Sequence, residues 1–182
     1  MEILPLSPHQ RINVIGTSGC GKSTFSKKLA EKLQLPYLEI DRIFWGPNWT
    51  EPPDDIFLKK LEDELNIDGW VLDGNYTRST PIKWKNVQTV IWLDYSLWTV
   101  CTRAFKRAIG RAISQTEIWE GTGNRESFKK LLSKDSIVLW TLKTFYPNRK
   151  KYSACLQDKN YAYIQFIRLS NPGQAKQFLS TL

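Results

Sequence analysis

An eight-residue motif near the N-terminus constrains the fold of this chain more than any other feature. Residues 16–23 read G-T-S-G-C-G-K-S, which fits the pattern G-x-x-x-x-G-K-[ST]. A short apolar stretch at residues 11–15 precedes the motif, and a helix-forming stretch at residues 24–33 follows it. Glycines let successive main-chain N–H groups turn toward one anion, and the following helix directs its positive end to the same place. A glycine turn that merely joins a strand to a helix is the structural alternative. The strand, loop and helix together predict a site for a nucleoside triphosphate.

Each polar residue of the motif has an expected role. Lys22 would contact the β- and γ-phosphates, and the hydroxyl of Ser23 would coordinate Mg²⁺. ATP and Mg²⁺ are therefore the predicted cofactors. Cys20 is interpreted as a small residue that fills a variable loop position. The residues predicted to bind the nucleotide are Gly16, Thr17, Ser18, Gly19, Cys20, Gly21, Lys22, Ser23 and Thr24.

The remaining sequence alternates apolar strand-like stretches with helical ones. Further strands are predicted at residues 37–41, 70–73, 89–94 and 162–169, and helices at 54–66, 96–113, 125–157 and after 172. Alternation of this kind predicts a parallel sheet covered by helices on both faces. We therefore expect an α/β, three-layer P-loop NTPase fold with a five-stranded parallel sheet and a helical lid. A length of 182 residues suits a single domain over 1–182, with the lid inserted at roughly 103–126.

Aspartates close three of the predicted strands, where ligands bind in parallel sheets. Asp73 is predicted to hold Mg²⁺ together with Ser23, and a loop-capping role is the alternative. Asp94 is interpreted as structural. Asp41 would orient or deprotonate the hydroxyl of a phosphoryl acceptor, and the adjacent Arg42 would pair with an acceptor phosphate.

Three arginines recur at helical spacing in the predicted lid. Arg103, Arg107 and Arg111 are each four residues apart and therefore share one face of a helix. A solvated face is the structural alternative. We predict that Arg103 and Arg107 act in catalysis by stabilising charge on the transferring phosphoryl group, and Arg125 is a further candidate.

Composition bounds the class of partner. The net charge of +8 fits either a pocket for several phosphates or binding to nucleic acid, and the dispersed basic residues favour phosphate. There is no apolar run of 18 residues or more and no secretory leader at the N-terminus, so no membrane association is expected. Three widely spaced cysteines fit reduced thiols and a cytoplasmic location.

Several stretches together resemble a known family. They are the motif at 16–23, L-E-I-D-R-I-F-W-G-P-N-W at 38–49, W-V-L-D-G-N-Y at 70–76, V-I-W-L-D-Y at 90–95, G-N-R-E-S-F at 123–128, K-D-S at 134–136 and F-I-R-L at 166–169. The chain resembles the adenylate-kinase-related P-loop kinases, in particular the bacterial proteins called DNA topology modulation proteins. This resemblance implies an ATP site at the loop, an acceptor site beyond the second strand and a lid around residues 103–125.

The acceptor side departs from adenylate kinases. Their D-G-x-P-R pattern is replaced by D-G-N-Y-T-R at residues 73–78, which puts Arg78 one residue later, and their T-G-D-x-x-R pattern does not occur. The acceptor contacts are predicted at Asp41, Arg42, Trp45 and Arg78. Trp45 and Trp49 would either stack on a ring or fasten their loop as a hydrophobic cluster.

These features predict an enzyme, a P-loop kinase that moves the γ-phosphoryl group of ATP·Mg to a nucleotide or a small hydroxylated acceptor. The alternative is a nucleotide-binding regulatory ATPase that acts on DNA or a protein partner through its basic helices. The expected partners are a nucleoside triphosphate and an acceptor, and the expected state is a monomer or a homodimer.

Overall fold

The computed structural model describes residues 9–125 and 136–182 and contains one five-stranded sheet. Its strands lie in the order β2-β3-β1-β4-β5, and neighbouring strands are parallel. The strands are β1 (Arg11–Gly16), β2 (Tyr37–Glu39), β3 (Trp70–Asp73), β4 (Thr89–Leu93) and β5 (Gln165–Leu169). This confirms the predicted parallel sheet. Because β1 is the central strand, the loop that follows it lies over the middle of the sheet.

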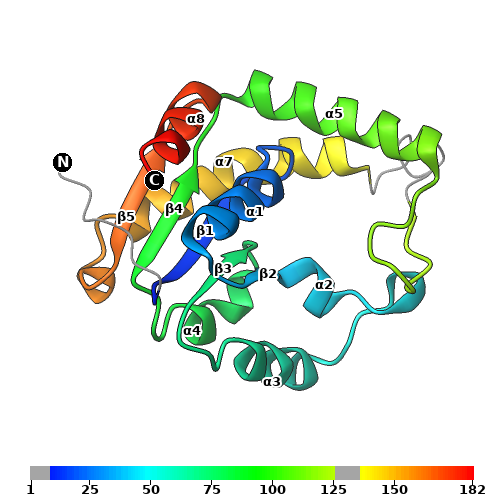
Figure 1. The fold of residues 1–182 in the computed structure, drawn as a ribbon. Coiled ribbons are helices and arrows are strands. Elements are labelled where there is room, and N and C mark those ends of the chain that lie inside the picture. The colour runs from blue at the N-terminus through cyan, green and yellow to red at the C-terminus, as the bar shows by residue number, and fades with distance from the viewer. Residues whose placement is uncertain (1–8, 126–135) are drawn as a thin grey trace.

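Helices connect the strands and cover the sheet (Figure 1). Their bounds are α1 (Lys22–Leu33), α2 (Ile40–Phe44), α3 (Asp54–Glu64), α4 (Thr80–Lys83), α5 (Leu97–Ser114), α7 (Ile137–Cys155) and α8 (Pro172–Ser180). Short 3₁₀ turns lie at η1 (Pro47–Trp49), η2 (Thr77–Ser79) and η3 (Lys159–Tyr161).

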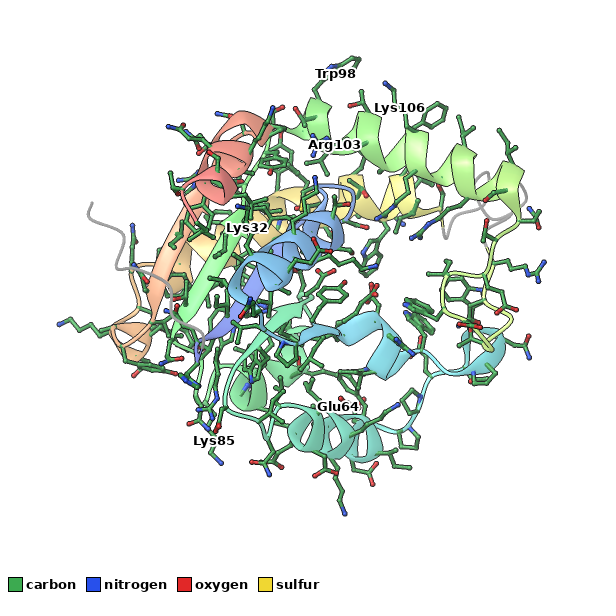
Figure 2. The ribbon with its side chains drawn as sticks, in the orientation of Figure 1. Lys32, Glu64, Lys85, Trp98, Arg103 and Lys106 are labelled. Carbon is green, nitrogen blue, oxygen red and sulfur yellow. The ribbon has the colours of Figure 1, made fainter. Side chains whose placement is uncertain are left out.

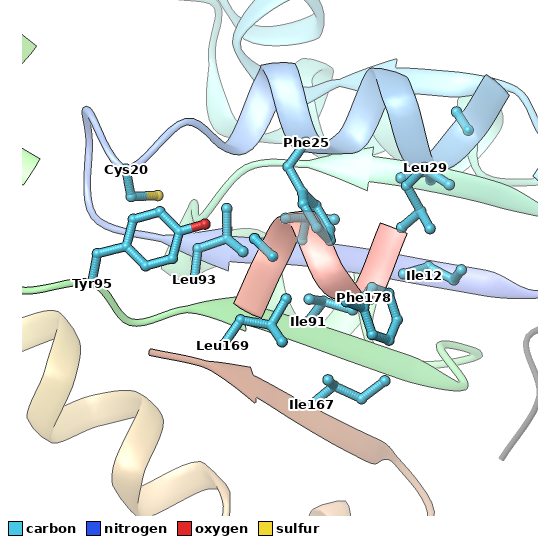
Figure 3. Packing of buried hydrophobic residues seen from close by; sticks show 14 of the residues in the cluster. Ile12, Cys20, Phe25, Leu29, Ile91, Leu93, Tyr95, Ile167, Leu169 and Phe178 are labelled. Atoms are coloured by element: carbon cyan, nitrogen blue, oxygen red, sulfur yellow. The ribbon is translucent and has the colours of Figure 1, made fainter. Parts of the chain in front are cut away.

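Alternate residues of the central strands point to opposite faces of the sheet, so both faces are apolar. Helices α1 and α8 pack on one face, where Phe25 and Phe178 meet Ile12 and Ile91 (Figure 3). The opposite cluster joins residues of α2 and α3 to Leu72, Trp92 and Tyr152. The layers of helix, sheet and helix therefore match the predicted fold class.

The second predicted strand was too long. Strand β2 ends at Glu39, and Asp41 lies in the short helix α2 and not at a strand end. The helix forms because its spacing of four residues lets Ile40 and Phe44 both bury against the apolar cluster under α3. Asp41 consequently projects from the first turn of a helix.

The lid prediction is covered in part. Helix α5 and the segment 115–125 lie within the described residues, whereas residue 126 and the first part of the predicted helix at 125–157 lie outside them. Within the described ranges, no helix combines the length and the apolar character that crossing a membrane requires.

Candidate functional site

The phosphate loop has the backbone geometry that its glycines predict. Gly19 and Gly21 have φ angles of 86° and 97°, in the left-handed region where a side chain is strained. A Cβ atom on Gly19 would lie 2.8 Å from the Cβ atom of Ala104 in α5. The loop therefore allows α5 to approach its backbone closely, and Gly21 precedes the first turn of α1.

Lys22 and Cys20 both contact the interior of the loop, Lys22 through hydrogen bonds and Cys20 through burial. The Nζ atom of Lys22 donates to the carbonyl oxygen of Gly16 at 2.9 Å and to that of Thr17 at 3.5 Å. Cys20 is fully buried, and burial raises the pKa of its thiol. A buried neutral thiol fits the interpretation of Cys20 as a packing residue.

Helix α5 directs its arginines at this loop. Arg103 donates through Nη1 to the carbonyl oxygen of Cys20 at 3.1 Å, and Arg107 donates through Nη2 to Oγ of Ser18 at 3.4 Å. Arg103 faces inward from α5, whereas Trp98 and Lys106 project outward (Figure 2). The structure thus places both predicted arginines beside the loop. Arg125 instead lies 3.7 Å from Glu117 in the segment 115–125.

A cavity of about 1050 Å³ lies beside the loop. It is bounded by α1, α5 and α8, with Ser23, Arg103, Arg111 and Pro172 among its lining residues. This volume is at the upper end of the range for small-molecule sites, so it can hold a nucleotide. The cavity also joins Lys28 and Lys32 to the arginines, which makes its surroundings basic.

Asp73 has the surroundings expected of a group that holds a metal. Its side chain lies at the end of β3 and is 4% exposed, and its Oδ2 atom accepts from the hydroxyl of Tyr37 at 3.3 Å. Its Oδ1 atom is buried and has no hydrogen-bond partner among the described residues. Burial raises the pKa of Asp73, and the nearby Lys22 ammonium partly offsets that effect. An unpaired carboxylate oxygen in this position fits Mg²⁺ or one of its water ligands.

Asp73 and Ser23 would share the metal with phosphate oxygens. Within the described parts of the chain, no three acidic, histidine or cysteine side chains gather closely enough to hold a metal by themselves. Such a site fits Mg²⁺, which commonly takes one or two carboxylates together with phosphate oxygens and water.

The predicted acceptor side contains two further carboxylates near Asp73, those of Glu39 and Asp41. Burial, followed by the charges of Asp73 and Asp41, raises the pKa of Glu39. Burial and the Asp41 carboxylate likewise raise the pKa of the Tyr76 phenol. Asp41 therefore lies close to both Tyr76 and Asp73 even though it belongs to a helix. Its neighbour Arg42 is exposed.

Arg78 is already engaged in the structure. Its guanidinium pairs with Asp54 at 2.6 Å and lies over the rings of Phe44 and Phe57 at 4.7 and 5.3 Å. An acceptor phosphate would compete with Asp54 for this side chain. Binding of substrate by Arg78 remains a prediction.

The tryptophans of the loop after α2 form an aromatic cluster. The ring centroid of Trp45 lies 4.9 Å from that of Phe44 and 5.5 Å from that of Trp49, which in turn lies 6.0 Å from that of Trp119. This arrangement agrees with the alternative in which they fasten their loop. Contact of Trp45 with a substrate stays a prediction.

Sequence reasoning missed three polar residues that organise the site. Asn75 and Lys83 bond the main chain around Gly16 and Gly74, and Asn124 joins the segment 115–125 to the loop after α2. The sequence D-G-N at 73–75 gave a signal for Asn75, because it directly follows a strand that ends at the site. Lys83 and Asn124 carry no comparable local signal.

Comparisons with known proteins identify the fold. No family model matches the sequence. A curated shikimate kinase from Sulfurihydrogenibium sp. (strain YO3AOP1) is 32% identical over 111 residues, a match that covers 52% of this chain and 66% of the relative, just under two thirds.

Solved structures match over nearly the whole chain. Shikimate kinase from Acinetobacter baumannii in complex with shikimate has a TM-score of 0.59 at 14% identity and covers 94% of this chain and 89% of its own. Shikimate kinase from Bacteroides thetaiotaomicron has a TM-score of 0.54 at 14% identity, and the match covers 94% of this chain and 95% of that one. A gluconokinase from Sinorhizobium meliloti 1021 has a TM-score of 0.52 at 15% identity, and the match covers 97% of this chain and 94% of that one. The chain therefore has the fold of the P-loop kinases. The narrower resemblance to topology modulation proteins stays a prediction.

Proposed function

We propose that this chain is an ATP-dependent kinase that transfers the γ-phosphoryl group of ATP to a small hydroxylated molecule or a nucleotide. The proposal rests mainly on the phosphate loop and its surroundings. Lys22 lies on the loop, Arg103 and Arg107 donate to it, and the buried carboxylate of Asp73 lies nearby. The likeness to shikimate kinases and a gluconokinase supports the proposal.

The residues divide the work of phosphoryl transfer. The main-chain N–H groups of residues 16–24 and the Lys22 ammonium would bind the triphosphate, and Arg103 and Arg107 would stabilise charge on the transferring group. Ser23 and Asp73 would hold Mg²⁺, which would supply positive charge to neutralise the phosphate oxygens. Helix α5 over the loop would limit access of water and so favour transfer over hydrolysis.

The acceptor would approach from the side of α2. Asp41 would accept the proton of the acceptor hydroxyl as its oxygen bonds to the γ-phosphorus, while the bond to the bridging oxygen of ADP breaks. Arg42, Trp45 and Arg78 are the proposed contacts for the rest of the acceptor. A cytoplasmic location and a monomeric or homodimeric state also stay predictions.

An acceptor screen tests this function. ADP release would be measured with ATP·Mg and, in turn, shikimate, gluconate, other polyols and nucleoside monophosphates. We expect release that depends on one acceptor class and is lost in Lys22→Ala. Slow hydrolysis that no acceptor changes and that DNA stimulates would contradict the kinase assignment and support the regulatory ATPase.

A further inference from the structure

The phenol of Tyr37 meets the carboxylate of Asp73 at the proposed metal site. Tyr37 begins β2, and its hydroxyl donates at 3.3 Å to the Oδ2 atom of Asp73, which ends the neighbouring strand β3. The other oxygen of that carboxylate, Oδ1, is buried and has no hydrogen-bond partner among the described residues. The phenol therefore occupies one oxygen of the carboxylate and leaves the other open to a ligand.

The hydroxyl of Ser23, the second residue proposed to hold Mg²⁺, lies beside the same two groups. Burial raises the pKa of the Asp73 carboxyl and of the Tyr37 phenol, and hydrogen bonding by Ser23 is among the effects that partly offset each rise. The charges of Asp73 and Glu39 raise the pKa of the phenol further, so it stays protonated at neutral pH and acts as a donor. Tyr37 thus belongs to the same group of side chains as Asp73 and Ser23.

Packing holds the ring of Tyr37 in place. The ring contacts the apolar cluster beneath α1, and the Nζ atom of Lys27 in α1 lies 5.4 Å from the ring centroid. Both contacts involve the ring and not the hydroxyl, so phenylalanine can keep them. Tyr37→Phe therefore removes the hydrogen bond to Asp73 and preserves the packing.

A fixed second oxygen matters for a carboxylate that holds a metal. Such carboxylates are themselves commonly hydrogen-bonded, and loss of the bonding partner weakens metal binding by about 10–100-fold. Here the Lys22 ammonium is a nearby opposite charge, and it partly offsets the effect of burial on the pKa of Asp73. Without a donor at Oδ2, the Asp73 side chain is free to turn toward Lys22. A carboxylate paired with that ammonium is less available to a metal.

We propose that Tyr37 is a positioning residue that fixes the Asp73 carboxylate for Mg²⁺. The inference rests on the proposed nucleotide and metal site at the phosphate loop. Tyr37 acts through Asp73 and need not contact the metal, the nucleotide or the acceptor. Because Asp73 serves the nucleotide only through the metal, loss of the phenol should weaken binding of ATP·Mg and spare binding of ATP alone.

Calorimetry with and without Mg²⁺ separates this role from a general structural one. A non-hydrolysable ATP analogue would be titrated into Tyr37→Phe in excess Mg²⁺ and, in parallel, in EDTA, with the rise in Tm as a second measure of binding. We expect the Kd of the Mg²⁺ complex to rise about tenfold, whereas the Kd of the metal-free analogue should equal that of the unchanged protein. Tyr146→Phe, at an exposed tyrosine of α7, is the matched control and should bind both forms as the unchanged protein does.

The outcomes are distinct. An unchanged Kd for the Mg²⁺ complex in Tyr37→Phe would overturn the inference and leave the proposed function standing. An equal rise in both Kd values would show that Tyr37 supports the loop in general, and it would also reject the inference. No binding heat and no rise in Tm with either form in the unchanged protein would overturn the inference and the proposed function together.

Discussion

Arg103 and Arg107 lie one helical turn apart on α5, and both donate to the phosphate loop. Arg103 bonds a main-chain carbonyl and lies 5.5 Å from the ring centroid of Tyr95, so packing holds it in place. Arg107 has the longer contact, 3.4 Å to a serine hydroxyl. Arg107 is therefore the arginine that can move to a phosphoryl group with the smaller loss of existing contacts.

Substitution of Arg107 by Met should lower kcat. A guanidinium that stabilises charge mainly in the transition state contributes a factor of about 10²–10³, and Met retains most of the side-chain length. Steady-state kinetics with the acceptor found in the screen would measure the change. Lys106→Met, on the outer side of α5, is the control (Figure 2). A kcat within threefold of the control would remove Arg107 from the catalytic residues.

Cys20 should react slowly with thiol reagents. Burial raises the pKa of all three thiols, but Cys20 is fully buried whereas Cys101 and Cys155 are partly exposed, so access to the reagent decides the order. Iodoacetamide reacts with the thiolate where it can reach it, so it should label Cys101 and Cys155 first. Peptide mass spectrometry over a time course would give the order. Labelling of Cys20 ahead of the other two would show that the loop opens in solution.

Asp73→Asn should stabilise the protein and reduce its activity. The pKa of Asp73 is higher in the folded state, so the carboxyl adds stability below its unfolded pKa of about 4, and that contribution is lost as the pH rises through the folded pKa. At neutral pH the buried carboxylate is charged and therefore destabilises the folded state, and the neutral amide of asparagine removes that cost. An amide is, however, a poorer ligand for Mg²⁺ than a carboxylate. Thermal unfolding against pH and Mg²⁺-dependent ADP release would measure the two effects. A lower Tm at pH 7 would contradict the prediction.

At the scale of elements, Asn124 joins the segment 115–125 to the loop after α2. Its side chain is fully buried, donates to the Gly46 carbonyl at 3.0 Å and accepts from the Trp49 N–H at 2.6 Å. The Asn48 N–H also donates to the Thr122 carbonyl at 2.9 Å. These bonds, with the contact of Trp49 and Trp119, connect the described part of the predicted lid to the predicted acceptor side.

Asn124→Ala should loosen this connection without unfolding the sheet. The substitution leaves a partly buried N–H and a partly buried carbonyl without their partner, which costs up to about 1–3 kcal/mol for each group and less where water reaches it. Local opening relieves that cost, so hydrogen exchange at the Trp49 amide should become faster while exchange in β1 is unchanged. Equal acceleration at both places would indicate global destabilisation instead. Unchanged exchange at Trp49 would show that Asn124 does not hold the two segments together.

At the scale of the whole molecule, the buried carboxylate of Asp94 joins elements that are distant in sequence. It pairs with Arg168 of β5 through both Nε and Nη2 and with Arg149 of α7 at 3.3 Å. Asp94 itself follows β4. These ion pairs agree with the structural interpretation of Asp94, whereas the Oδ1 atom of Asp73 has no hydrogen-bond partner among the described residues.

Asp94→Ala should destabilise the fold more than it changes chemistry. Removing one partner of a buried ion pair destabilises by about 3 kcal/mol, which partial exposure of both arginines can reduce. Urea unfolding would show the loss as a lower midpoint with an unchanged slope. A midpoint equal to that of the unchanged protein would show that the pairs contribute nothing net to stability.

The sequence predicted the features of the fold that depend on neighbouring residues alone. The phosphate loop, all five strands to within three residues at each end, and helix α5 followed from motif and periodicity. Periodicity also placed the arginines on one face of α5, but it left open whether that face meets the loop or solvent. Residues 40–44 are the exception. The alternating pattern extended the predicted strand to Asp41, whereas Ile40 and Phe44 have the four-residue spacing of a helix. The helix is favoured because it buries Ile40 and Phe44 in an apolar cluster that residues distant in the sequence form.

The sequence by itself determined that a phosphate-binding loop stands between a strand and a helix, because glycine conformations and helix polarity are local properties. The tertiary structure decided which groups face that loop. Asn75, Lys83 and Asn124 acquire their roles from strand order and from contacts across 9 to 78 positions of sequence. No local pattern encodes a hydrogen bond between segments that meet only when the sheet has formed.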